Sequence, residues 1–199
     1  MLKVNETFYS LQGEGHWTGQ AMFFIRLSGC NLNCPWCDTQ YKTFTQKEEE
    51  ALVEEALEFP SKRVVITGGE PTLQYLRKLT SLLHFGGLKT HLETNGTQII
   101  ARDNWDWVAV SPKSPVRTLN PRTISMANEI KFICGLPNWE KYISEVIKTF
   151  NPKESRFFLM PLAEGPNGIK THLPKAIEYC LNHPEFTLCL QMHKIIGGK

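Results

Sequence analysis

The sequence has 199 residues, of which 41% are hydrophobic and 21% charged, an ordinary composition for a globular protein. We therefore expect a single domain over residues 1–199. The formal net charge of +2 is too small to indicate nucleic acid or an anionic membrane as a partner.

The chain lacks a run of about 20 apolar residues that could span a bilayer. Its first residues, Met1–Glu6, also lack the apolar core of a signal peptide. We therefore expect a cytoplasmic protein. In a reducing cytosol, the six cysteines bind metal or pack in the core rather than form disulfides.

Short runs rich in β-branched and aromatic residues predict strands, and several are apolar throughout, as expected for strands covered on both faces. In chain order they are Met22–Leu27, Arg63–Thr67, Lys89–Glu93, Trp107–Ser111, Glu129–Ile133, Arg156–Met160 and Thr187–Gln191.

Four helices are expected between these strands. Thr45–Glu48 has the spacing of a capping box at the start of the first helix, Gly86 ends the second, and Asn138 caps the third. The four apolar faces are Leu52, Val53, Ala56 and Leu57; Leu73, Leu76, Leu79 and Leu83; Trp139, Tyr142, Ile143, Val146, Ile147 and Phe150; and Leu173, Ala176, Ile177, Cys180 and Leu181.

Strands that alternate with helices predict an α/β fold built from parallel βαβ units. A complete eight-fold barrel usually needs about 250 residues. This shorter chain is therefore expected to form an incomplete, open TIM-type β/α barrel. Such folds carry their chemistry at the C-terminal ends of the strands.

Three cysteines, Cys30, Cys34 and Cys37, follow the first predicted strand with the spacing C-x₃-C-x₂-C. Three thiolates can hold three irons of a [4Fe-4S] cluster and leave the fourth iron open, whereas electron-transfer clusters normally have a full set of cysteines. A structural zinc site with His16 as fourth ligand and a redox pair at Cys34 and Cys37 are the alternatives. A zinc knuckle usually has two separated ligand pairs, and no second pair is present.

The segment Thr67–Pro71, with the sequence Thr-Gly-Gly-Glu-Pro, follows the second predicted strand. Its glycines allow the backbone to approach a ligand closely, and Glu70 could accept a charged hydrogen bond from an ammonium group. By itself the segment is equally typical of a turn between a strand and a helix, with Pro71 near the helix start.

The cysteine motif followed by Gly-Gly-Glu-Pro resembles the radical S-adenosylmethionine (radical SAM) superfamily. Further segments, in the same order along the chain, are similar to the 7-carboxy-7-deazaguanine synthase family. These segments are Ser10–Gly15, Phe24–Cys30, Cys37–Thr39, Glu93–Thr97, Ser111–Lys113, Asn128–Lys131 and Gln191–Lys194.

The resemblance implies a radical SAM fold and a lyase that converts 6-carboxy-5,6,7,8-tetrahydropterin to 7-carboxy-7-deazaguanine with loss of ammonia, in 7-deazapurine (queuosine precursor) biosynthesis. It also implies a [4Fe-4S] cluster, S-adenosylmethionine, Mg²⁺, a flavodoxin or ferredoxin as one-electron donor, and a homodimer. One alternative is a radical SAM activase that acts on a protein partner, which would not need Arg26 or the Leu11–Gly15 segment. Another is a non-enzymatic zinc-binding or interaction module. No nucleic-acid or membrane partner is implied.

The resemblance also assigns roles to individual residues. Cys30, Cys34 and Cys37 would hold the cluster, and Thr39 would bind Mg²⁺, which prefers hard oxygen ligands. The residues expected to contact substrate are Leu11, Gln12, Gly13, Glu14, Arg26, Thr67 and Lys199. Those expected to contact the cofactor are Cys37, Asp38, Gly68, Gly69, Glu70, Ser111, Pro112 and Lys113. Beyond the cluster and cofactor, no residue is identified as a catalytic acid or base.

Overall fold

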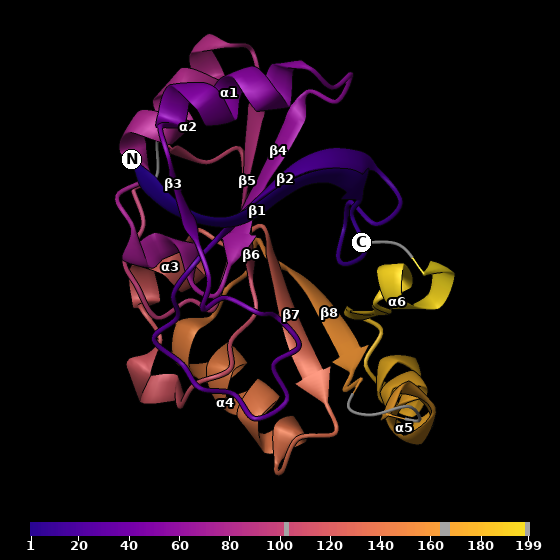
Figure 1. Ribbon diagram of the computed structural model, residues 1–199. Helices are drawn as coiled ribbons and strands as arrows, with labels where there is room; N and C mark the ends of the chain where they lie inside the picture. Colours follow the sequence, from indigo (N-terminus) through magenta and orange to yellow (C-terminus); the bar gives the residue numbers. More distant parts are fainter. Residues whose placement is uncertain (102–103, 164–167, 198–199) are drawn as a thin grey trace.

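The protein was analysed as a computed structural model that describes residues 1–101, 104–163 and 168–197 (Figure 1). The described strands form one sheet in the order β3-β1-β2-β4-β5-β6-β7-β8-β9. From β2 to β9 all neighbours pair in parallel, while β1 and β3 add an antiparallel edge. This arrangement confirms the open, mostly parallel sheet of a partial barrel. The bounds are β1 Leu2–Leu11, β2 Ala21–Leu27, β3 Thr45–Lys47, β4 Arg63–Gly68, β5 Lys89–Thr94, β6 Trp107–Val110, β7 Glu129–Cys134, β8 Arg156–Pro161 and β9 Phe186–Leu188.

The four predicted helices are present as α1, α2, α4 and α5, and two short helices, α3 and α6, add to them. Two 3₁₀ turns, Pro71–Leu73 and Val116–Thr118, complete the described helical segments. The helix bounds are α1 Glu49–Leu57, α2 Arg77–Phe85, α3 Pro121–Ser125, α4 Trp139–Phe150, α5 Gly168–Asn182 and α6 Met192–Ile196. None of the described helices is long and apolar enough to cross a membrane.

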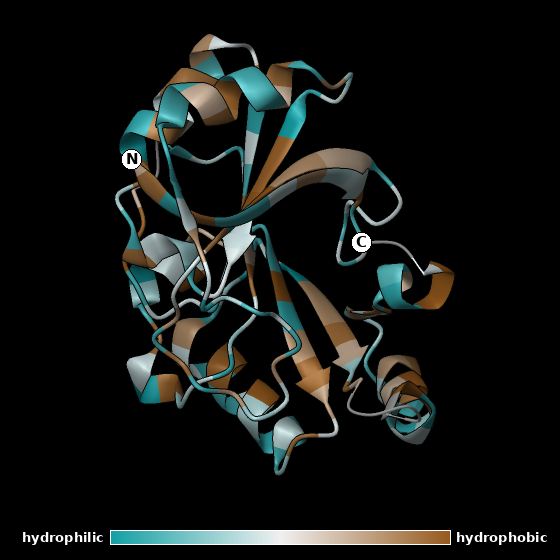
Figure 2. Cartoon of the chain, viewed as in Figure 1, coloured by the Kyte–Doolittle hydropathy of each residue, from teal (hydrophilic) through white to brown (hydrophobic). Residues whose placement is uncertain are grey.

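Alternate residues of each strand face opposite sides of the sheet. On one side, α1 and α2 pack on β2 and β4 through buried residues such as Leu52, Leu83 and Ile66. On the same side, α4 and α5 pack on β6 to β8 through Ile143, Ala176 and neighbouring residues. Figure 2 shows long hydrophobic stretches along β7 and β8. The remaining strand residues face the inside of the partial barrel. This inner face carries small apolar clusters, such as Met22, Phe24 and Val65, next to the charged residues Glu93 and Lys131.

The start of the first helix differs from the prediction. Thr45–Lys47 is not a capping box but the edge strand β3, which pairs with Leu2–Val4. α1 therefore begins at Glu49, and its N-cap residue Glu48 makes no side-chain cap hydrogen bond. Pairing with β1 satisfies the backbone of this segment, so the helical conformation has no advantage there.

The C-terminal part also differs from the prediction. β9 ends at Leu188, and Gln191 caps α6 instead of lying in the strand. On α5, the predicted apolar face is only partly covered, since Leu181 is 79% exposed.

Candidate active site

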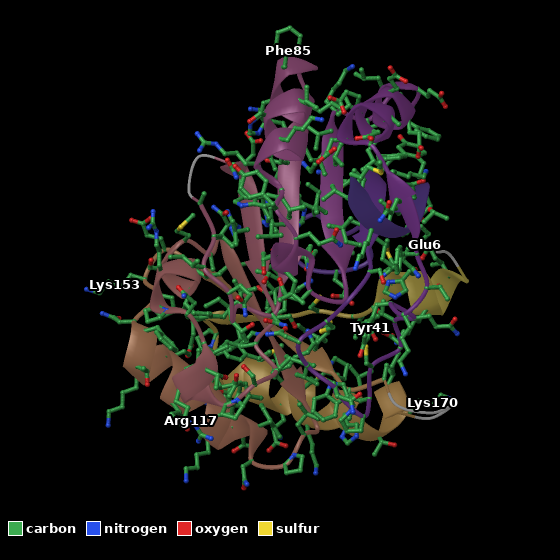
Figure 3. All side chains as sticks on the ribbon, turned by 60° about the vertical axis from the view of Figure 1, so that its left-hand side comes forward. Glu6, Tyr41, Phe85, Arg117, Lys153 and Lys170 are labelled. Atoms are coloured by element: carbon green, nitrogen blue, oxygen red, sulfur yellow. The ribbon has the colours of Figure 1, made fainter. Side chains whose placement is uncertain are left out.

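A cavity of about 790 Å³ lies on the inner face of the sheet at the C-terminal ends of the parallel strands. Figure 3 labels two of its lining residues, Glu6 on β1 and Tyr41 in the loop after β2, on the same side of the molecule. The cavity brings together predicted site residues that are far apart in sequence. Those that line it are Leu11, Gln12, Gly13, Glu14, Arg26, Cys30, Cys34, Cys37, Asp38, Thr39, Thr67, Gly68, Gly69, Ser111 and Lys113.

The three cysteines after β2 are free thiols that face this cavity. Cys30 and Cys34 are partly buried and Cys37 is exposed. Burial raises the pKa of the Cys30 and Cys34 thiols, so a bound metal would be needed to hold them as thiolates at neutral pH. Three soft donors in one short loop fit three irons of a cluster.

His16 does not accompany the cysteines. Its ring stacks on Trp107 at 5.0 Å between centroids, and it does not line the cavity. A zinc site completed by His16 therefore finds no support.

Gly69 places the cysteine loop directly on the end of β4. A Cβ at this position would lie 2.2 Å from the Gly29 carbonyl oxygen and 2.8 Å from the Cys30 Cβ. The Glu70 amide donates to the same Gly29 carbonyl at 2.8 Å. Only glycine allows this approach, so the Gly-Gly-Glu-Pro segment fixes the position of the first cysteine.

Glu70 does not present its side chain to the cavity as expected. The residue is fully buried, and its carboxylate accepts hydrogen bonds from Thr72, from the Thr94 hydroxyl at 2.7 Å and from the Asn95 amide at 2.7 Å. These donors already satisfy the charge. Glu70 thus joins the ends of β4 and β5 beneath the cavity, and a contact of its carboxylate with an ammonium group stays a prediction.

Lys131 of β7 is the centre of the polar floor of the cavity. It is 2% exposed, and its ammonium group donates to Glu14 at 2.9 Å and to Glu93 at 2.6 Å. Gln12 donates to Glu93 at 3.1 Å, and Gln191 donates to Glu14 at 2.8 Å. The loop after β1, the strands β5 and β7, and the start of α6 therefore meet in one hydrogen-bonded network.

This network controls the charges of its members. Burial lowers the pKa of Lys131, but the charges of Glu14 and Glu93 outweigh burial and raise it well above its ordinary value. Burial alone would raise the pKa of Glu93, but the charge of Lys131 brings it down to about 2. The floor of the cavity is thus fully ionised at neutral pH, with two carboxylates around one ammonium group.

Arg26 lies on β2 at the edge of the cavity. Its Nε donates to Glu6 at 2.9 Å, and its guanidinium lies 5.6 Å from the centre of the Phe8 ring. Both contacts restrict the long side chain and lower the entropy lost when it binds an anion. The group is partly exposed, as a ligand-binding arginine must be.

The rim of the cavity carries the remaining predicted residues. Asp38 pairs with Lys194; burial raises the pKa of Asp38, but the hydrogen bond and charge of Lys194 lower it overall. The Lys113 ammonium donates to the Ser111 carbonyl at 3.2 Å. Pro112, between these two residues, does not line the cavity. Lys199 lies outside the described residues.

Lys131, Glu93 and His193 also line the cavity, and the sequence indicated no site role for the first two. Lys131 could have been found because it lies in the middle of the predicted strand Glu129–Ile133, where a charge is rarely buried without a partner. Glu93 is likewise a charged residue in a predicted strand, at the end of Lys89–Glu93. His193 is brought in by α6, and this contact depends on tertiary structure.

The chain resembles known proteins in sequence and in fold. The sequence pattern of the Radical SAM superfamily matches residues 24–151. The 7-carboxy-7-deazaguanine synthases of Bacteroides thetaiotaomicron and Synechocystis are each 36% identical to the chain; the first match covers 98% of both chains, the second 98% of this chain and 92% of the relative. The crystal structure of QueE from Escherichia coli superposes with a TM-score of 0.80 at 30% identity, covering 96% of this chain and 94% of that one. The chain therefore belongs to the radical SAM superfamily and, within it, to the 7-carboxy-7-deazaguanine synthase family.

Proposed function

We propose that this chain is a 7-carboxy-7-deazaguanine synthase, a radical SAM lyase that converts 6-carboxy-5,6,7,8-tetrahydropterin to 7-carboxy-7-deazaguanine with loss of ammonia. The proposal rests on one cavity that combines three free cysteines with Arg26 and the Gln12–Glu93–Lys131 floor. Relatives that carry this name and match almost the whole chain support it.

Membership of the superfamily implies a [4Fe-4S] cluster and S-adenosylmethionine as cofactors. Cys30, Cys34 and Cys37 would hold the cluster. The backbone of Gly68–Gly69 and the Ser111–Lys113 segment would face S-adenosylmethionine. When bound, the cluster and S-adenosylmethionine would supply the one-electron chemistry that starts the reaction.

The protein residues bind and orient the substrate. The Arg26 guanidinium can pair with the pterin carboxylate in a bidentate manner. The Glu93 and Glu14 carboxylates can accept hydrogen bonds from the guanidine-like edge of the pterin, because Lys131 keeps both ionised. Thr39 would contribute a hydroxyl ligand to Mg²⁺ next to the substrate carboxylate. The cavity therefore offers a cation to one end of the substrate and anions to the other.

Three further properties complete the proposal. A flavodoxin or ferredoxin would supply the electron, and the exposed position of Cys37 is compatible with a cluster close to the protein surface. The protein would be cytoplasmic, because its thiols need a reducing compartment. It would also form a homodimer, which sedimentation analysis of the cluster-loaded protein would test.

The proposed function is tested by anaerobic incubation of the cluster-loaded protein with the pterin, S-adenosylmethionine, reductant and Mg²⁺. We expect a deazapurine product from the wild type and from Glu140→Gln, an exposed change on α4. Arg26→Ala should lose most of this product but still cleave S-adenosylmethionine slowly. An activase would instead be insensitive to Arg26→Ala, so unchanged turnover in this variant would contradict the proposal.

A further inference from the structure

Behind the cavity floor, two ionisable side chains are completely buried and not used by the mechanism above. Glu129 of β7 accepts a hydrogen bond from the His16 amide at 2.8 Å through Oε2, while its Oε1 has no partner. His91 of β5 has a hydrogen bond at neither ring nitrogen, although its Nε2 lies 3.3 Å from Glu93 Oε1. Both residues are 0% exposed. Buried polar atoms of this kind rarely stay unsatisfied, so they indicate a function or a bound species.

The sheet register brings these groups together. Glu93 and Glu129 both pair with Ala109, which lies on the strand between them. Because the alanine side chain is small, the larger groups on either side can meet across β6. One ligand atom each from His91, Glu93 and Glu129 lies within 4.8 Å of the others. Glu93 belongs to both the cavity lining and this cluster, so it connects the two.

The loop after β1 seals the cluster from solvent. Gly15 has a φ of +71°, and a Cβ at this position would lie 2.2 Å from Glu129 Oε1. The backbone of the loop therefore lies directly against the carboxyl group. The rings of His16 and Trp17 then pack around Trp107 below it.

Burial raises the pKa of Glu129 to about 7, and the charge of Lys131 does not offset this effect. Burial also lowers the pKa of His91. At neutral pH the pair can thus consist of a carboxylic acid, which donates, and a neutral imidazole, which accepts. Several other groups act on the pKa values of the pair. They are Arg63 of β4, Glu93 of β5, Lys131 of β7, and Glu14 and the His16 backbone amide in the loop after β1.

We propose that Glu129 and His91 hold one exchangeable proton behind Glu93 and exchange it with the substrate through Glu93. This inference rests on the proposed function. When the carbon–nitrogen bond breaks, its electron pair stays on nitrogen, and the proton moves from Glu129 through His91 and Glu93 to the departing amine. When the new ring becomes aromatic, a ring carbon releases a proton that returns to Glu129 by the same path. Substrate becomes product plus ammonia, so neither an oxidant nor a reductant is consumed.

A proton fits this cluster better than a metal ion. His91 and Glu129 form no direct ion pair. Their ligand atoms lie within 4.8 Å of each other. One bridging water molecule with two hydrogen bonds of about 2.8 Å spans roughly 4.5 Å, so it could carry a proton between the two side chains. The Lys131 ammonium, 2.6 Å from Glu93, already supplies a positive charge to the same carboxylate. A divalent ion beside it would experience strong repulsion in a buried site.

Glu129→Gln tests the proposal, with the exposed Glu140→Gln as matched control. Glutamine keeps the shape and the hydrogen bond from His16 but cannot release a proton. We expect kcat to fall roughly 10²-fold with little change in KM, and the limb of the pH–rate profile near neutral pH to disappear. The control should behave as wild type. An unchanged kcat and pH profile in Glu129→Gln would overturn the proposal.

An infrared titration of the cluster-loaded protein tests the proton directly and needs no turnover. Wild type should show a carboxylic-acid band that disappears with a midpoint near neutral pH, and Glu129→Gln should lack it. Absence of this band from wild type would overturn the proposal even if Glu129→Gln fails to fold. A stoichiometric metal ion besides iron that is lost in His91→Gln would also overturn it. If wild type shows the band but makes no deazapurine, the proposed function fails and the proton site stands.

Discussion

Replacement of Lys131 by methionine should strongly destabilise the protein. Methionine has a similar length, so the packing of the floor changes little, but the ammonium group between Glu14 and Glu93 is lost. Two carboxylates whose side chains are only 19% and 15% exposed then lie close together without a counter-charge. Breaking a buried ion pair by removal of one partner typically costs about 3–5 kcal/mol.

The pKa of Glu93 gives a second value for the stability that Lys131 contributes. The fold lowers it from 4.5 to about 2, which corresponds to roughly 3 kcal/mol of stability. A lowered carboxyl pKa stabilises the folded state above the unfolded value, and this stability is lost only as the pH falls through the folded value. It is therefore fully present at neutral pH in the wild type. Most of it should disappear in Lys131→Met, because the ammonium charge is the main cause of the lowering.

The variant should also acquire a pH dependence that the wild type lacks at this site. Without Lys131, burial raises the pKa of Glu14 and Glu93, so the folded state binds protons more tightly than the unfolded chain. Stability then falls as the pH rises above the ordinary carboxyl pKa of 4.5, so the difference from wild type should be larger at about pH 8 than at about pH 5.

Urea unfolding of the cluster-loaded protein, followed anaerobically by circular dichroism at both pH values, measures this difference. Lys141→Met, an exposed change on α4, is the control and should cost less than about 0.5 kcal/mol. A cost of Lys131→Met no larger than that of this control, or a cost that does not grow with pH, would contradict the ion-pair role of Lys131.

Three further substitutions test the rest of the site. Cys34→Ala should abolish bound iron and its visible absorption, whereas Cys180→Ala, outside the cavity, should retain both; iron in the first variant would contradict the cluster assignment. Gly69→Ala should cost about 1–3 kcal/mol in thermal unfolding, since its methyl group would clash with the Gly29 carbonyl; an unchanged Tm would show that the cysteine loop can move away. Arg26→Lys should raise KM for the pterin about tenfold by loss of the bidentate fork, and an equal KM would exclude carboxylate recognition there.

The parallel core of the fold could be predicted because its signals are local. Apolar runs such as Arg63–Thr67 and Glu129–Ile133 became β4 and β7 almost to the residue. β1 was missed because Leu2–Leu11 mixes polar and apolar residues and gains its strand conformation from pairing with β2 and β3. Pairing with β1 also explains why Thr45–Lys47 is a strand and not the predicted start of a helix.

The site was predictable only where a motif carries the chemistry. Cys30, Cys34 and Cys37 lie close together in sequence, so their convergence follows from spacing alone. The floor is different, because the contact between Glu14 and Lys131 joins residues 117 positions apart. Glu70 lies in a motif that is recognisable in the sequence. Only the fold, however, shows that Thr94 and Asn95 donate hydrogen bonds to its carboxylate.

The most direct test of the proposed function is a quantitative product balance. The cluster-loaded protein is incubated anaerobically with the pterin, S-adenosylmethionine, reductant and Mg²⁺, and deazapurine and ammonia are both measured. The proposed function predicts that 7-carboxy-7-deazaguanine and ammonia form in equal amounts, and only when the pterin is present. Cleavage of S-adenosylmethionine without either product, by protein that contains its full complement of iron, would contradict it.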